Sequence, residues 1–258
     1  MKKLWVVLMV AIMVTGFVGA SDAAVIGNWS GSSRSWNNAD MSILRAALIA
    51  AGHTIRPDAA ISSAELAADN IFVIGEAAST PNSTEMAALS AFVNGGGILL
   101  VLTDSGASGV AGANAIFAAI GSALLFSGAS PSASPFPADI FTNGPPFNIV
   151  GQTLTTSPGN EISGGTTLAG SFIHYQQIGA GYVFGFGDRS DHNFAVPDST
   201  TANGRLFLNI AAAAGQAQVP ASEIVPTLTE WGMIMSVVLM GFLSIYYLRR
   251  KRFDLNNA

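Results

Sequence analysis

The sequence predicts an α/β fold in which a mainly parallel sheet is covered by helices on both faces. Strand and helix patterns alternate over residues 24–126, as they do in chains built from parallel strands and crossover helices. The stretches 71–74 and 98–102 are apolar throughout, which is typical of strands buried on both faces. In such a sheet the ligand site lies beyond the carboxyl ends of the strands.

The first elements follow from hydrophobic periodicity and from helix end signals. We expect strands at residues 24–28 and 53–56, a helix at 39–51 capped by Asn38, and a short helix at 63–68.

The helix after Asn82 has the clearest start signal in the chain. Asn82 is a favourable N-cap, Glu85 at the third helical position completes a capping box, and three glycines at 95–97 end the helix. A further helix is expected at 110–120, followed by a short strand at 124–126.

Residues 127–170 interrupt this alternation. They contain six prolines among many serines, threonines and glycines, which predicts an insertion of loops and short strands over a face or an edge of the sheet. The runs 172–176 and 181–187 then predict an antiparallel β-hairpin, and Asn203 is expected to cap a last helix that ends at Gly215.

Composition excludes several classes of function. Residues 24–217 contain no lysine, five arginines and twelve acidic residues, so no basic face for nucleic acid is available. The chain has no cysteine, which excludes disulfides, a thiol nucleophile and cysteine-bound metal.

The N-terminal residues 1–23 read as a secretory signal peptide. Lys2 and Lys3 are followed by the apolar run 4–14 and then by small residues suited to cleavage. The export machinery and signal peptidase are therefore expected partners, and the domain at 24–215 is expected outside the cytoplasmic membrane.

The C-terminal part has the pattern of a membrane segment. After a polar linker at 216–224, residues 231–248 carry no charge and are predicted to form one transmembrane helix. The basic cluster that follows is expected to keep the tail at 253–258 in the cytoplasm. This cluster consists of Arg249, Arg250, Lys251 and Arg252.

Residues 225–252 also carry a motif ahead of the apolar segment. The motif consists of Pro226, Thr227, Leu228, Trp231 and Gly232. Together with the span and the basic cluster it resembles the IPTL-type C-terminal sorting domain (IPTL-CTERM) of Gram-negative bacteria. Such tails are similar to PEP-type signals read by exosortase-like membrane enzymes. The resemblance implies sorting to the cell envelope or surface and processing by such an enzyme, whereas a plain membrane anchor is the alternative.

The order of elements in the exported domain resembles the class I glutamine-amidotransferase-like superfamily. The similarity rests on the Asn-capped helix, the three glycines, the strand at 98–102, the hairpin and the Gly187–Asp188 loop. It implies an amidotransferase-like or flavodoxin-like sheet and a pocket. The chain lacks the cysteine nucleophile of that superfamily, so glutamine hydrolysis is not expected.

Polar residues follow the expected strands, and several are candidates to line one crevice. They are Asn28, Glu76, Asp104, Ser105, Asp188, Asp191 and His192. One interpretation is hydrolysis, with Ser105 as nucleophile, His192 as base, and Asp188 or Asp191 orienting the base. The chain lacks a G-x-S-x-G elbow, so the alternative is that Ser105 is a turn residue.

Two further interpretations concern binding. Asp188, Asp191, His192 and Asp198 are potential metal ligands, although they match no calcium-loop or zinc spacing. The alternative is an exposed turn. The aromatic residues Trp29, Trp36 and Tyr175 are candidates for stacking on sugars, or else belong to the core.

The predicted function is that of an exported, envelope-sorted protein that displays a non-catalytic α/β binding or structural domain. The alternative is a hydrolase acting on an envelope polymer or glycan through Ser105, His192 and Asp188. No cofactor is predicted.

Overall fold

The computed structural model describes residues 23–77, 79–104, 109–144, 146–154, 159–188 and 201–217, together with residues 236, 239 and 240. The chain divides into two compact units, 1–218 and 219–258. The described sheet and helices belong to the first unit.

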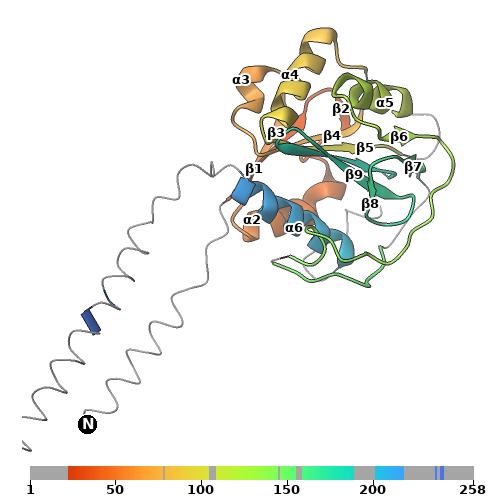
Figure 1. Cartoon of the computed structure of the whole chain (residues 1–258). Helices are drawn as coiled ribbons and strands as arrows, with labels where there is room; N and C mark the ends of the chain where they lie inside the picture. Colours follow the sequence, from red (N-terminus) through yellow and green to blue (C-terminus); the bar gives the residue numbers. More distant parts are fainter. Residues whose placement is uncertain are drawn as a thin grey trace, which may run out of the picture. The chain divides into compact units, whose positions relative to one another are not determined.

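The sheet has a parallel core in the order β3-β1-β4-β5-β10, extended by two antiparallel strands, β9 and β8 (Figure 1). The strands along this path are β1 (Val25–Trp29), β3 (Thr54–Ala59), β4 (Ile71–Ala77), β5 (Ile98–Leu102), β8 (Thr166–Thr167), β9 (Ile173–Ile178) and β10 (Gly181–Phe186). An eighth strand, β2 (Ser32–Arg34), pairs with β4 off this path. In chain order the five parallel strands follow the sequence 2-1-3-4-5, which is that of flavodoxin-like sheets. The chain therefore reverses its direction of winding between β1 and β4.

Helices cover both faces of the sheet (Figure 1). They are α2 (Ser42–Ala50), α3 (Ser63–Leu66), α4 (Ser83–Asn94), α5 (Val110–Ala119) and α6 (Ala202–Ala217). The helices α2 and α6 pack on one face, while α3, α4 and α5 pack on the other. Successive side chains of a strand point to opposite faces, so Val73 joins the first core and Phe72 the second. This two-sided burial explains why residues 71–74 of β4 and all of β5 are apolar.

The expected capping box of α4 is confirmed. The backbone N–H groups of Thr84 and Glu85 donate to Asn82 Oδ1 at 2.9 and 3.0 Å, and Asn82 N–H donates to Glu85 Oε2 at 2.7 Å. The predicted antiparallel hairpin is also present, since β9 and β10 pair from Ile173–Phe186 to Ile178–Gly181.

Two other predicted caps are wrong. Asn38 makes no capping hydrogen bond, because a 3-10 turn at Ala39–Met41 precedes α2. At the start of α6, Thr201 lies outside the helix and its hydroxyl accepts from Gly204 N–H at 3.2 Å. Asn203 lies inside the first turn, so Thr201 takes the capping position in its place.

The stretch 127–170 contributes to the core instead of only lying over it. Phe136, Phe141 and Ile149 are buried against the face that carries α2 and α6. The short strands β6 (Leu125–Phe126) and β7 (Ile162–Ser163) pair with each other at the two ends of this segment. The insertion is therefore an integral part of the domain.

The predicted C-terminal transmembrane helix is corrected. Crossing the hydrocarbon core takes about 20 apolar helical residues, and α6, the longest helix in the described part of the chain, has 16. No helix among the described residues is long and apolar enough to cross a membrane. The described residues thus form a mixed α/β domain, and the predicted transmembrane helix has no support in them.

The other terminal predictions fall almost entirely outside the described residues. These are the signal peptide at 1–23, the sorting motif and basic cluster within 225–252, and the tail at 253–258. The structure gives none of them support.

Candidate functional site

The strand register brings three of the predicted acidic residues to one edge of the sheet. Leu102 of β5 pairs with Gly75 of β4 on one side and with Phe186 of β10 on the other. Gly75, Leu102 and Phe186 thus lie side by side on neighbouring strands. Glu76 follows one residue after Gly75, Asp104 two residues after Leu102, and Asp188 two residues after Phe186. We call this edge, at the carboxyl ends of β4, β5 and β10, the carboxyl edge.

Asn28 lies lower on the sheet and has a structural role. Its side chain is buried, Nδ2 donates to the carbonyl of Val73 at 3.0 Å, and Oδ1 accepts from Trp36 N–H at 3.1 Å. These two bonds hold the segment after β1 against β4.

A short strand, β2 (Ser32–Arg34), takes the place of β1 beside the last residues of β4. Whereas β1 pairs with residues 71–73 of β4, β2 runs antiparallel and pairs Ser32 with Ala77 and Arg34 with Gly75. The hydroxyl of Ser33 donates to Glu76 Oε2 at 2.6 Å. Glu76 is buried and has a φ of 50°, a left-handed conformation that is strained for a residue other than glycine.

Trp36 fills the place where a ligand would enter this fold. The reversal of winding between β1 and β4 is the usual position of a ligand crevice. Here the remaining cavity measures about 10 Å³ and is bordered by Asn28, Ser35, Trp36, Met41, Val73, Gly75 and Leu102. Trp36 is 1% exposed, and its indole Nε1 has no hydrogen-bond partner among the described residues. Such a space holds about one water molecule and no organic ligand.

The insertion covers the other half of the carboxyl edge. The N–H of Asn160 donates to the carbonyl of Gly187 at 2.5 Å, and Asn160 Nδ2 donates to the backbone carbonyl of Asp104. A Cβ at Gly159 would lie 2.1 Å from the carbonyl oxygen of Gly187, so only glycine permits this approach. Asp188 is 2% exposed beneath this cover.

The three interpretations based on sequence fare differently. Trp29 and Trp36 are buried in the two cores, so the core alternative holds for them. Tyr175 is half-buried, and its hydroxyl donates to Asp139 Oδ2 at 2.6 Å. Of the proposed triad only Asp188 is described, since Ser105 and His192 lie outside the described residues.

Of the four potential metal ligands, the structure describes only Asp188. Asp191, His192 and Asp198 lie outside the described part, and within that part no three His, Asp or Glu side chains are placed to hold a metal ion.

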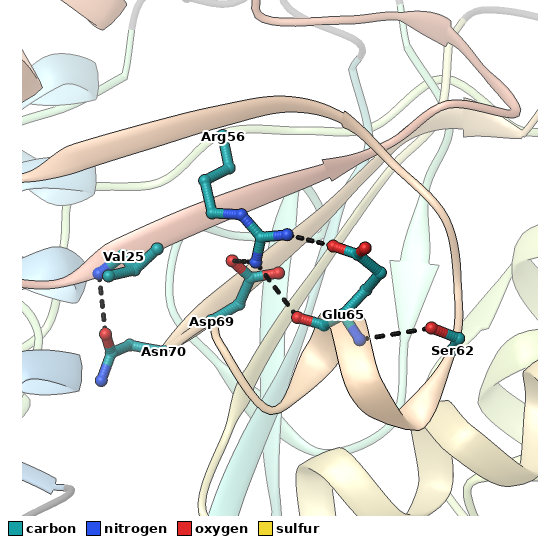
Figure 2. A network of polar contacts seen from close by, with 6 residues as sticks. All are labelled: Val25, Arg56, Ser62, Glu65, Asp69 and Asn70. Atoms are coloured by element: carbon teal, nitrogen blue, oxygen red, sulfur yellow. Dashed lines mark hydrogen bonds and ion pairs between the residues drawn. The ribbon is translucent and has the colours of Figure 1, made fainter.

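The structure shows a network of charged residues that was not predicted from the sequence (Figure 2). It lies at the other edge of the sheet, near the amino end of β4. Arg56 Nη1 donates to Asp69 Oδ1 at 2.9 Å and to the carbonyl of Glu65 at 3.1 Å, while Nη2 pairs with the Glu65 carboxylate. Residues 56, 65 and 69 are close in a sequence with few charges, but spacing alone does not show that they meet. The network joins the edge strand β3 to α3 and to the loop before β4.

Asp69 is the most unusual group of this network. Its side chain is fully buried, and Oδ2 has no hydrogen-bond partner among the described residues. Burial raises the pKa of Asp69 to about 6, although Arg56 acts in the opposite direction. Asp69 is also one of the residues that line a cavity of about 270 Å³ between α3 and α4.

Comparison with known proteins shows the fold and no more. No family model and no curated protein matches the chain. The mmIFT52 N-terminal domain is similar with a TM-score of 0.57 and 11% identity, over 74% of this chain and 97% of that domain.

Two other solved structures resemble the chain more distantly. The exo-beta-1,4-mannosidase Op5Man5 from Opitutaceae bacterium strain TAV5 has a TM-score of 0.43 and 17% identity, over 81% of this chain and 39% of the mannosidase. The cytoplasmic protein STM1381 from Salmonella typhimurium LT2 has a TM-score of 0.49 and 13% identity, over 74% and 98% of the two chains.

Proposed function

We propose that residues 24–215 form a non-catalytic binding or structural domain that acts outside the cytoplasmic membrane. The observation that supports the non-catalytic role is the filled crevice at the reversal of winding, where Trp36 and β2 occupy the usual ligand position.

The polar groups at this position are engaged in holding the fold. Asn28 bonds to two backbone groups, and the hydroxyl of Ser32 accepts from Gly75 N–H at 3.1 Å. Acid–base catalysis needs a substrate within hydrogen-bond reach of the catalytic group. The crevice beside Trp36, as the described residues form it, measures about 10 Å³ and does not admit one.

Export is proposed on the sequence alone. The order of a basic start, an apolar run and small residues within 1–23 supports it, and the export machinery is the partner that this order implies.

Hydrolytic turnover tests the non-catalytic role. The full chain should hydrolyse chromogenic esters and glycosides no faster than its Ser105→Ala/His192→Ala double variant. The exposed Ser163→Ala serves as the matched control. Turnover that disappears in the double variant but persists in Ser163→Ala would establish a hydrolase and end the proposal.

Cell fractionation tests the location. We expect the protein outside the cytoplasmic membrane of a bacterial host. Recovery of the whole chain in the cytosol contradicts the export part while leaving the non-catalytic role untouched.

A further inference from the structure

The cavity between α3 and α4 lies at the amino ends of β4 and β5, opposite the carboxyl edge. Its volume of about 270 Å³ is slightly below that of pockets for drug-sized ligands, which suits a smaller molecule. The lining consists of Ser63, Leu66, Ala67, Asp69, Ala88, Ala91, Phe92, Gly95 and Gly97.

A charged network with net negative charge adjoins this cavity, and of its members Asp69 lies in the lining. The network there has one cation, Arg56, and two carboxylates, Glu65 and Asp69. Once Asp69 is ionised, the network therefore keeps one uncompensated negative charge. Asp69 Oδ2 is covered by protein, so it acts on the cavity through its charge across a wall of low dielectric.

The C-terminal end of α4 adds a second negative contribution. This helix has 12 residues, and its C-cap, Gly95, lines the cavity. The C-terminal end of a helix carries a partial negative charge that favours cations. In α4 this contribution is reduced, because the carbonyls of residues 91–94 accept hydrogen bonds from the N–H groups of residues 95–97 and 180. The last turn of α4 contains no basic residue that would neutralise it.

The remaining wall is apolar. It is formed by Leu66 of α3 and by Ala88, Ala91 and Phe92 of α4. The Phe92 ring packs directly over Gly97: a Cβ at residue 97 would lie 2.3 Å from the ring. This packing leaves the ring at the cavity wall.

We propose that this cavity binds a small organic ammonium ion, with its apolar body against Leu66, Ala88 and Phe92 and its cationic group toward Asp69 and the end of α4. An anion is disfavoured by both negative contributions. A bare metal ion is disfavoured by the apolar wall. The site lies away from the carboxyl edge, so this inference goes beyond the proposed function and stands even if that edge proves catalytic.

Three probes of similar shape and different charge test the proposal on the full chain. Phenethylammonium should raise the melting temperature by about 2–4 °C at a saturating concentration, since a ligand that binds only the folded state stabilises it. Phenethyl alcohol should shift the melting temperature much less, and phenylpropionate should not raise it. Equal shifts for the ammonium ion and the alcohol, or no shift at all, would overturn the proposal.

Two substitutions on α4 localise the site. Ala91→Leu fills the cavity from its wall, whereas Ala87→Leu places the same side chain one turn earlier at an exposed position outside the lining. The ammonium shift should disappear in Ala91→Leu and persist in Ala87→Leu. Retention of the shift in Ala91→Leu places binding elsewhere and overturns the proposal.

Two measurements on the unaltered protein complete the test should Ala91→Leu not fold. Amide chemical shifts on adding phenethylammonium should change within residues 63–69 and 88–97, and changes confined to other residues contradict the site. Affinity for the ammonium ion should also rise by up to about tenfold from pH 5 to pH 8, because Asp69 ionises with a pKa of about 6. An affinity that falls over this range contradicts the role of Asp69.

Discussion

The two edges of the sheet differ in a way that reverses the usual expectation for this strand order. At the reversal of winding on the carboxyl edge, where flavodoxin-like sheets normally hold a ligand, the described residues around Trp36 and β2 leave a cavity of about 10 Å³. At the amino ends of β4 and β5, which we call the amino edge and where no site is expected, a cavity of about 270 Å³ lies between α3 and α4. Strand order thus determines where a crevice can form, while side chains determine whether it is open.

The polar groups of the two edges differ as well. Beside the filled crevice on the carboxyl side, Asn28 and Ser32 are neutral and bonded to the backbone, and the buried carboxylate of Glu76 accepts from the Ser33 hydroxyl. At the amino edge Asp69 is a buried carboxyl with one oxygen that lacks a partner among the described residues. Burying an incompletely bonded carboxylate costs free energy. At the amino edge this fold therefore buries a destabilising carboxyl group, Asp69, next to a cavity.

The largest expected effect is that of Trp36→Ala at the carboxyl edge. Removing a fully buried indole should lower the free energy of unfolding by about 3–5 kcal/mol, measured by urea denaturation. Trp36→Phe should cost less than about 1.5 kcal/mol, because it keeps most of the volume and removes an Nε1 donor without a described partner. Added indole should raise the melting temperature of Trp36→Ala and not that of the wild type, because it can fill the space that the substitution leaves. An unchanged melting temperature of Trp36→Ala would mean that the space around residue 36 collapses in this variant.

The second effect is a pH dependence that belongs to the amino edge. With its pKa raised to about 6, Asp69 binds a proton more tightly in the folded state, so its contribution to stability is greatest below pH 4 and is lost as the pH rises through 6. A rise of about two pKa units corresponds to about 3 kcal/mol. Relative to Asp69→Asn, the wild type should lose up to this amount of unfolding free energy between pH 4 and pH 7.

Asp58→Asn is the control for this pH dependence. Asp58 is an exposed carboxylate on β3. Its replacement should leave the pH profile of the wild type nearly unchanged. If the dependence of unfolding free energy on pH flattens equally in Asp58→Asn and Asp69→Asn, Asp69 is not the source of this dependence.

The third effect concerns the close packing around Asp69. A Cβ at Gly27 would lie 2.3 Å from Asp69 Oδ2 and 2.9 Å from the Phe72 ring, so Gly27→Ala should cost about 1–3 kcal/mol of unfolding free energy. Gly112→Ala in α5 is the control, because its Cβ meets the nearest side chain at 3.3 Å. Equal stability of the two variants would show that Asp69 moves freely, and the contrast between the edges would then weaken.

The smallest effect belongs to α4, which starts on the carboxyl side of the sheet and ends at the cavity. Asn82→Ala should lower the free energy of unfolding by about 1 kcal/mol through loss of the capping box, and Asn82→Ser should recover most of it. Neither change should affect binding of phenethylammonium, because Asn82 lies at the far end of the helix. A loss of binding in Asn82→Ala would show that the two edges communicate through α4.

Local signals were predictable from the sequence where short-range chemistry decides them. The capping box of Asn82 and Glu85 and the pairing of β9 with β10 depend on neighbouring residues, and both were expected. The cap of α6 was misplaced by two residues, because Asn203 and Thr201 both suit that role and the helix begins between them. The predicted transmembrane helix rested on the uncharged run 231–248 and on the basic cluster that follows it, and no described helix supports it.

By itself the sequence determined an α/β domain with a two-sided core, because strands such as β5 contain no polar residue that can face water. It also determined which polar residues follow the strand ends. Only the tertiary structure decided that Trp36 fills the crevice and that Arg56, Glu65 and Asp69 meet beside a cavity. Contacts between distant residues depend on register and packing, which no local pattern in the chain specifies.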